Sequence, residues 1–238
     1  MSPLYSSFNY SFGEGDGTPR IVTDGLVLNL DAGRQNSYGG SGTTWRDLSG
    51  RGNNGTLVNT PTYSSSNGGS FNFIGTNQYI TVPASTDWNF GLNNFAIDLW
   101  IYPTSYSSGN PTILQIPPYN SSSPSGILLY LTSGGNLSLY TNTQYSSNVI
   151  APLNRWTHCV YTRLSGILNY YAQTVAGSTA NLSTFSITNS QSLKIGADLQ
   201  YNTDYFRGNI SAVKIYNRAL SAAEISQNFQ ATRGRYGI

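Results

Sequence analysis

The stretch Phe95-Ala96-Ile97-Asp98-Leu99-Trp100-Ile101-Tyr102 decides the fold class of this chain. Its odd-numbered positions are all large and apolar, whereas its even-numbered positions hold Ala, Asp, Trp and Tyr. Successive side chains of a β-strand point to opposite faces of the sheet. The alternation therefore predicts a strand whose odd-numbered residues face an apolar core.

Short runs of the same kind recur on both sides of this stretch, separated by loops rich in Gly, Asn and Ser. About a dozen strands without a long helix between them indicate an all-β sandwich of two sheets. One short helix is expected near the end of the chain, where Ser221 and Glu224 have the spacing of a capping box. The further strands are expected at residues 26–30, 71–73, 79–82, 127–131, 137–141, 156–163, 167–172, 193–196 and 208–216.

The chain is poor in charge, because Asp, Glu, Lys and Arg make up only 9% of it, against roughly 25% in average proteins. With a net charge of +2, the electrostatic repulsion that keeps freely diffusing proteins apart is weak. Either much of the surface is covered in an assembly, or Ser and Asn keep the protein soluble. No run of basic residues could neutralise several phosphates, so nucleic acid is not an expected partner.

The single cysteine, Cys159, excludes a disulfide within the chain and is expected to be a buried, inert thiol. The first residues lack the basic and apolar regions of a signal peptide. No apolar run approaches the roughly 20 residues that span a bilayer. We therefore expect no membrane insertion, and folding in a cytoplasm even if the protein works elsewhere.

Residues 1–24 form a predicted N-terminal extended arm, ahead of one domain at residues 25–238. Aromatic residues alternate with polar ones in the arm, and a Gly-rich link follows. The arm either docks on a partner subunit or packs back on its own domain. The aromatic residues expected to anchor it are Tyr5, Phe8, Tyr10 and Phe12.

Several motifs, in this order and spacing, resemble the laminin G-like jelly roll of the concanavalin A-like lectin/glucanase superfamily. The resemblance covers about residues 25–238 and implies a two-sheet antiparallel jelly-roll sandwich. It departs from the family at residues 169–172, where a common Asn-Gly turn is missing. The motifs are Asp47-Leu48-Ser49-Gly50-Arg51-Gly52-Asn53-Asn54-Gly55, Phe73-Ile74-Gly75-Thr76-Asn77-Gln78-Tyr79-Ile80, Trp156-Thr157-His158-Cys159-Val160 and Ile215-Tyr216-Asn217-Arg218-Ala219-Leu220-Ser221-Ala222-Ala223-Glu224-Ile225.

The superfamily includes glucanases, which use two carboxylates about 5 to 10 Å apart. Asp98 has no acidic partner on its own face of the strand, and Glu224 is used by the helix cap. Asp198 and Asp204 lie six residues apart in a predicted loop. His158, the only histidine, occupies a strand position that the family fills for packing, which argues against a Ser-His-Asp triad. We therefore expect no enzymatic activity.

Relatives of this fold often bind Ca²⁺ with Asp, Asn and backbone oxygens at a sheet edge, and no other cofactor is expected. The alternative is that the same side chains make Asx-turns. The candidate calcium ligands are Asp31, Asp47, Asn53 and Asn54.

Carbohydrate binding would need aromatic platforms beside amide and carboxylate groups. Predicted loops contain such a set, although Tyr and Asn are abundant throughout the chain. The candidate glycan-binding residues are Tyr119, Asn120, Tyr145, Asn148, Asp198, Tyr201, Asp204 and Tyr205.

The opening Gly25-Leu26-Val27-Leu28-Asn29-Leu30-Asp31-Ala32-Gly33 and the ending Arg235-Tyr236-Gly237-Ile238 are similar to marine bacteriophage structural proteins that carry this domain. This resemblance implies a non-enzymatic virion structural protein: a capsid decoration, knob, or tail or fibre component. It would be made in the host cytoplasm, lie on the virion surface, and contact other virion proteins and copies of itself. The alternative is a lectin-like module that binds host-surface polysaccharide.

Overall fold

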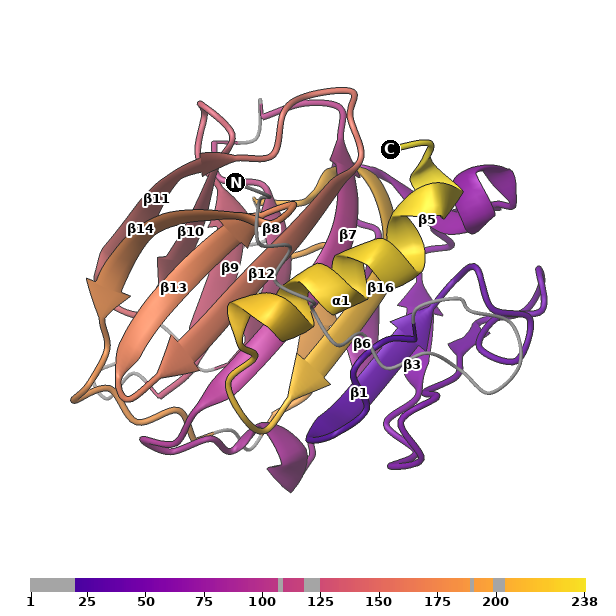
Figure 1. Ribbon diagram of the computed structural model, residues 1–238. Helices are drawn as coiled ribbons and strands as arrows, with labels where there is room; N and C mark the ends of the chain where they lie inside the picture. Colours follow the sequence, from indigo (N-terminus) through magenta and orange to yellow (C-terminus); the bar gives the residue numbers. More distant parts are fainter. Residues whose placement is uncertain (1–19, 107–108, 118–124, 189–190, 199–203) are drawn as a thin grey trace, which may run out of the picture.

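The computed structural model describes residues 20–106, 109–117, 125–188, 191–198 and 204–238. These residues form two antiparallel sheets that pack face to face, and one helix lies on the outer face of one of them (Figure 1). The architecture confirms the predicted all-β jelly-roll sandwich. None of the helices in the described part of the chain has the length and hydrophobicity needed to cross a membrane.

One sheet, which we call the helix-side sheet, contains the predicted strand at residues 95–102 in its centre. Strand β1 (Leu26–Asp31) pairs with β16 but stands off the main path of this sheet. The order along the path is β14 (Val175–Asn181), β13 (Ile167–Ala172), β12 (Thr157–Leu164), β7 (Phe95–Pro103), β16 (Arg207–Tyr216), β5 (Ser70–Ile74) and β4 (Thr62–Ser64).

The other sheet, which we call the second sheet, faces it across the core. It includes strands that the sequence pattern did not predict, above all β11 and β2 at its two ends. These strands are paired on one side only and expose much of their surface, so they lack a strong apolar alternation. The order is β11 (Gln144–Ile150), β10 (Asn136–Tyr140), β9 (Ile127–Leu131), β8 (Thr112–Ile116), β15 (Leu193–Ile195), β6 (Tyr79–Val82), β3 (Gly55–Val58) and β2 (Thr44–Trp45).

The core between the sheets confirms the alternation in β7. The four odd-numbered residues of the stretch belong to the main apolar cluster. Ala96 and Trp100 instead face the helix, where they join separate clusters. Cys159 is buried as expected, and this burial raises the pKa of its thiol.

The missing Asn-Gly turn does not prevent a hairpin between β13 and β14. Ala172 pairs with Val175, and Gln173 takes the positive φ of 59° that the turn requires. The Gln173 side chain donates a hydrogen bond to the carbonyl oxygen of Trp156, at 3.3 Å. The side-chain contact ties this unusual turn to the neighbouring loop.

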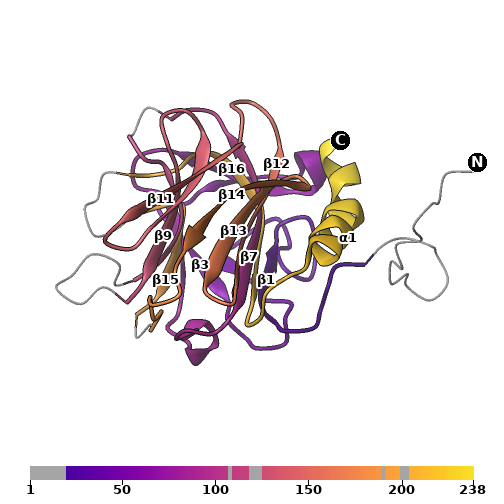
Figure 2. The same cartoon turned by 60° about the vertical axis from the view of Figure 1, so that its left-hand side comes forward.

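Helix α1 (Ala222–Thr232) covers the outer face of the helix-side sheet, and Figure 2 shows it as a separate outer layer. Ser221 and Glu224 form the predicted capping box at its start. The described ranges also contain three 3₁₀ turns. They are η1 (Ser66–Gly68), η2 (Thr86–Trp88) and η3 (Arg233–Tyr236).

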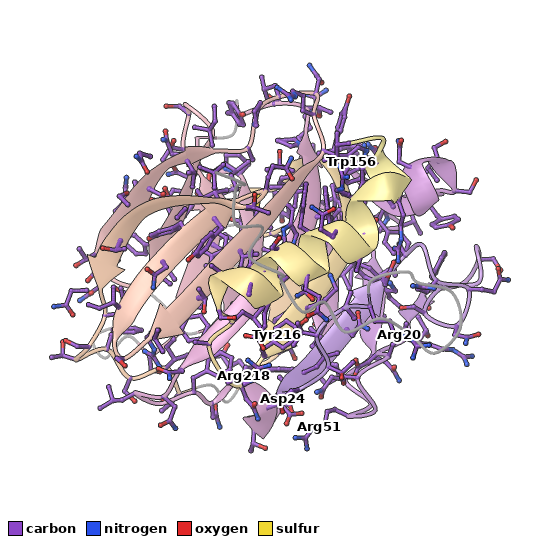
Figure 3. The ribbon with its side chains drawn as sticks, in the orientation of Figure 1. Arg20, Asp24, Arg51, Trp156, Tyr216 and Arg218 are labelled. Atoms are coloured by element: carbon purple, nitrogen blue, oxygen red, sulfur yellow. The ribbon has the colours of Figure 1, made fainter. Side chains whose placement is uncertain are left out.

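Residues 20–24, at the end of the predicted arm, pack on their own domain. The Val22 amide donates to Asn228 Oδ1 at 2.8 Å, and Tyr216 Oη donates to the Val22 carbonyl at 3.1 Å. Asp24 and Arg218 form an ion pair of 2.7 Å below the first turn of the helix (Figure 3). The predicted anchor residues Tyr5, Phe8, Tyr10 and Phe12 lie outside the described residues.

Candidate functional site

A polar hollow of about 570 Å³ lies in the connection between β1 and β2, at one end of the second sheet. Strands β11 and β14 lie at the other side of the sandwich (Figure 1). The residues that line the polar hollow are Gln35, Asn36, Ser37, Gly39, Ser41, Gly42, Thr43, Thr44 and Arg46.

Hydrogen bonds within the loop fix the shape of the polar hollow. The Ser37 and Tyr38 amides donate to the Arg34 carbonyl at 2.8 and 2.9 Å, which makes one tight turn. The Arg46 amide donates to the Ser37 carbonyl at 2.8 Å, and Tyr38 Oη donates to the Gly42 carbonyl at 2.9 Å. These bonds cross the loop from side to side, so the hollow is preformed.

Aromatic side chains support the loop from below. The Tyr38 ring lies 4.8 Å from the ring of Phe71 and 5.0 Å from that of Tyr63, and the Trp45 ring lies 4.9 Å from Phe71. Tilted and edge-to-face pairs at such distances are favourable beyond their burial alone. The loop is therefore anchored in the core at Tyr38 and Trp45, on both sides of the lining residues.

The chemistry of the polar hollow is that of hydroxyl and amide groups with one cation. Its amides can donate and accept hydrogen bonds, as can the hydroxyls of Ser41, Thr43 and Thr44. Arg46 is the only charged residue among the described residues that line it. Such a lining suits a ligand with many hydroxyl groups.

Asp98, the acidic residue of the central strand β7, is enclosed beneath helix α1. His158 Nε2 lies 2.9 Å from Asp98 Oδ2, and Lys214 Nζ lies 3.1 Å from Oδ1. Asn228 of the helix also donates to Oδ2, at 2.9 Å. Burial raises the pKa of Asp98, but the charges of His158 and Lys214 and these hydrogen bonds outweigh it and hold the pKa well below its ordinary value.

An enclosed and fully paired carboxylate cannot meet a substrate, so Asp98 has a structural role. His158 lies in the interior, as expected from the sequence, and its contact of 2.9 Å with Asp98 is an addition that the sequence did not indicate.

The structure brings part of the predicted glycan-binding set together. Gln115 Nε2 donates to Asp198 Oδ1 at 3.0 Å, and the Thr112 amide donates to the Asp204 carbonyl at 3.1 Å. Tyr205 forms a bridge with the same Thr112. Burial, followed by the charge of Asp198, raises the pKa of Asp204. These three predicted residues therefore meet beside β8.

The other described members of that set lie elsewhere. Tyr145 and Asn148 are on β11, and strands β10, β9 and β8 separate β11 from β15. The side chain of Asn148 accepts a hydrogen bond from the Ser178 amide at 2.7 Å. Tyr119, Asn120 and Tyr201 lie outside the described residues.

The candidate calcium ligands make the contacts of the Asx-turn alternative. Asp47 Oδ1 accepts from the amides of Asn29 and Ser49, and Oδ2 accepts from the Ser49 hydroxyl and the Asn53 amide. Asn54 Oδ1 accepts from the Asp47 amide. Four donors already surround this carboxylate, and calcium binding in this loop stays a prediction.

The remaining calcium candidate, Asp31, takes part in a different contact. Arg235 Nη1 lies 2.7 Å from Asp31 Oδ1, and the Gly33 amide donates to the same oxygen at 2.9 Å. Across the described ranges, no group of three or more His, Cys, Asp or Glu side chains could hold a metal ion.

The sequence pattern did not predict the polar hollow, because none of the described residues that line it is an aromatic platform. One signal was present: Gly39-Gly40-Ser41-Gly42 between Tyr38 and Trp45. Gly40 and Gly42 have φ values of +91° and +90°, a region that other residues rarely adopt. A glycine cluster between two core aromatics therefore indicated a tightly shaped loop.

Comparison with solved structures finds the same fold in several binding domains. The binding domain of Paraclostridial Mosquitocidal Protein 1 superposes with a TM-score of 0.66 at 17% identity, over 87% of this chain and 52% of that one. The binding domain of Botulinum Neurotoxin DC, in complex with SialylT, gives 0.65 at 15% identity, over 88% and 52%. This chain thus spans about half the length of those toxin domains.

A third solved structure matches along nearly its whole length. Domain 4 of AbnA, a GH43 extracellular arabinanase from Geobacillus stearothermophilus, in complex with arabinotriose, gives a TM-score of 0.63 at 18% identity, over 85% of this chain and 97% of that one.

No curated protein matches this chain. The Laminin_G_3 model of the concanavalin A-like lectin/glucanases superfamily matches residues 74–226, more than half of the chain. These residues carry most strands of both sheets and the start of helix α1, and the chain belongs to the concanavalin A-like lectin/glucanase superfamily.

Proposed function

We propose that this chain is a non-enzymatic carbohydrate-binding module and that the polar hollow is its binding site. The observation that carries the proposal is a preformed hollow lined by hydroxyls, amides and one guanidinium. Ligand sites are concave and largely preformed, with a few convergent polar groups that fix orientation. Saccharides present hydroxyl groups that both donate and accept, which such a lining can match.

The solved structures support the same proposal. Two of those described above are binding domains, and the arabinanase domain is in complex with arabinotriose. The non-enzymatic part rests on the carboxylates. None of the described residues that line the polar hollow is acidic, whereas glycoside hydrolysis uses a pair of carboxyl groups.

Filling the hollow tests the proposal. Nothing lies within 4 Å of a Cβ placed on Gly39, so Gly39→Trp should fold normally and occupy the hollow. Glycan-array binding by the wild-type protein, and its loss in this variant with an unchanged melting temperature, is the expected result. Gly234→Trp is the matched control, because a Cβ there also meets nothing within 4 Å and Gly234 is not part of the hollow. Equal binding by all three proteins would contradict the proposal.

We also propose, as a second candidate, that the module is carried on a bacteriophage virion as a decoration, knob, or tail or fibre component. The supporting observation is the charge-poor composition, with only 9% charged residues. A surface of this kind is compatible with contacts to other virion proteins or to copies of itself. Mass spectrometry of purified particles should detect the chain, and deletion of residues 2–20 should remove it. Absence of the full-length chain from purified particles would contradict this role.

A further inference from the structure

We propose that the polar hollow selects acidic sugars and that Arg46 pairs with the sugar carboxylate. The inference rests on the proposed function, because it names the ligand class of the same site. Arg46 is the only charged residue among the described residues that line the hollow, and its charge is positive. A carboxylated sugar is therefore favoured over its neutral counterpart.

The guanidinium of Arg46 is available for a ligand. Arg46 is exposed, and its guanidinium makes no hydrogen bond or ion pair with the described part of the chain. Arg218 and Arg235, in contrast, each pair with a carboxylate at 2.7 Å. An unpaired guanidinium at the wall of a hollow can bind an anion without first breaking a contact.

The main chain at Arg46 is fixed, so the base of this side chain is held in place. The Arg46 amide donates to the Ser37 carbonyl, and Ser37 Oγ donates to the Arg46 carbonyl at 2.5 Å. Ser37 Oγ also accepts from the Asp31 amide at 3.2 Å. A buried serine thus links Arg46, the residue that follows β2, to the strand β1.

Neighbouring carboxylates do not cancel this charge by pairing with it. Asp47, the next residue, already accepts four hydrogen bonds from amides and a hydroxyl. Asp31 pairs with Arg235. The carboxylates closest in sequence are thus committed to other groups, and a ligand carboxylate would not compete with them for Arg46.

The remaining lining decides between carbohydrate classes. A planar guanidinium matches a carboxylate with two parallel hydrogen bonds, which adds both strength and orientation. No aromatic residue is among the described residues that line the hollow, so a sugar ring cannot stack there. Recognition must then come from hydrogen bonds and charge, and the amides of Gln35 and Asn36 are left for the sugar hydroxyls.

Matched ligand pairs and matched variants test this inference. Tetragalacturonate and its methyl ester differ in charge but not in backbone, and sialyllactose and its methyl ester form a second pair. Binding is measured by calorimetry and on an array of neutral, carboxylated and sulfated glycans, at 50 and 500 mM NaCl. Arg46→Gln is compared with Arg155→Gln, which removes the same charge at an exposed position outside the hollow.

The expected result is that carboxylated glycans bind, that their esterified or neutral partners bind more weakly, and that high salt reduces the difference. Arg46→Gln should lower affinity for the acidic glycan by about tenfold or more, as loss of a charged hydrogen-bond pair does. Arg155→Gln should leave it unchanged. Arg46→Lys should restore part of the affinity, because it keeps the charge but not the planar fork.

Four other outcomes overturn the inference. If neutral glycans bind as well as acidic ones and Arg46→Gln has no effect, while Gly39→Trp abolishes binding, the acidic class is wrong and the proposed function stands. If only sulfated glycans bind, the carboxylate assignment is wrong. If no glycan binds, or if Gly39→Trp leaves binding intact, the inference and the proposed function fall together.

Discussion

At the scale of single residues, the partners of Asp98 show what a strand pattern leaves undetermined. The sequence argued against a catalytic role for Asp98, but it did not indicate that Asp98 is enclosed with Lys214 and His158. These partners come from strands distant in sequence, β16 and β12. No local pattern could have identified them, because only the sheet register places them beside Asp98.

Removing the charge of Asp98 should destabilise the fold strongly. Asp98→Asn leaves Lys214 buried without a counter-charge, which typically costs ~3–5 kcal/mol. Asp24→Asn is the control. The Asp24 side chain pairs with Arg218 but is 85% exposed, and exposed pairs contribute little. Urea unfolding of the two variants measures the difference. Similar midpoints for both would show that the buried pair contributes no more than the exposed one.

At the scale of elements, the clearest local signals predicted helix α1 and β7, whereas the buried β8 and the exposed β11 and β14 were missed. Helix α1 has its capping box and β7 has its alternation, and both lie where the sequence placed them. Strands β11 and β14 are largely exposed and polar, so only their hydrogen-bonded neighbours define them. The polar hollow was missed for a related reason, since its shape depends on contacts across a loop rather than on residue type.

The cap of helix α1 gives a prediction at this scale. Ser221 Oγ accepts from the Glu224 amide, and Glu224 accepts in return from the Ser221 amide at 2.9 Å. Ser221→Ala should therefore lower the free energy of unfolding by about 1 kcal/mol. Ser226→Ala, inside the same helix, should be neutral or slightly stabilising because Ala is the better helix former. Chemical denaturation of both variants checks this, and an unchanged Ser221→Ala would mean that the cap is not needed.

At the scale of the whole molecule, the polar hollow and the edge strands β11 and β14 occupy opposite ends of the sandwich. On the side away from the hollow, β11 and β14 meet across the gap between the sheets. The Asn148 amide donates to Ser178 Oγ at 3.2 Å, and the Ser178 amide donates back to Asn148 Oδ1. We expect this end to be the one that contacts other proteins, because the proposed binding site lies at the opposite end.

The edge formed by β14 leads to the last prediction. Edge strands usually carry charges or Pro that prevent pairing with another chain, but β14 has neither. Strand β11 contacts β14 at Ser178, whereas Val175 at the start of β14 is 62% exposed. We expect the protein to self-associate through this edge at high concentration, and Val175→Lys to shift it toward the monomer. Leu92→Lys is the control, because Leu92 is 58% exposed but belongs to no strand. Sedimentation velocity over a concentration series measures the association. Equal association of both variants would place the contact elsewhere, and glycan binding should be the same in both because neither residue lines the polar hollow.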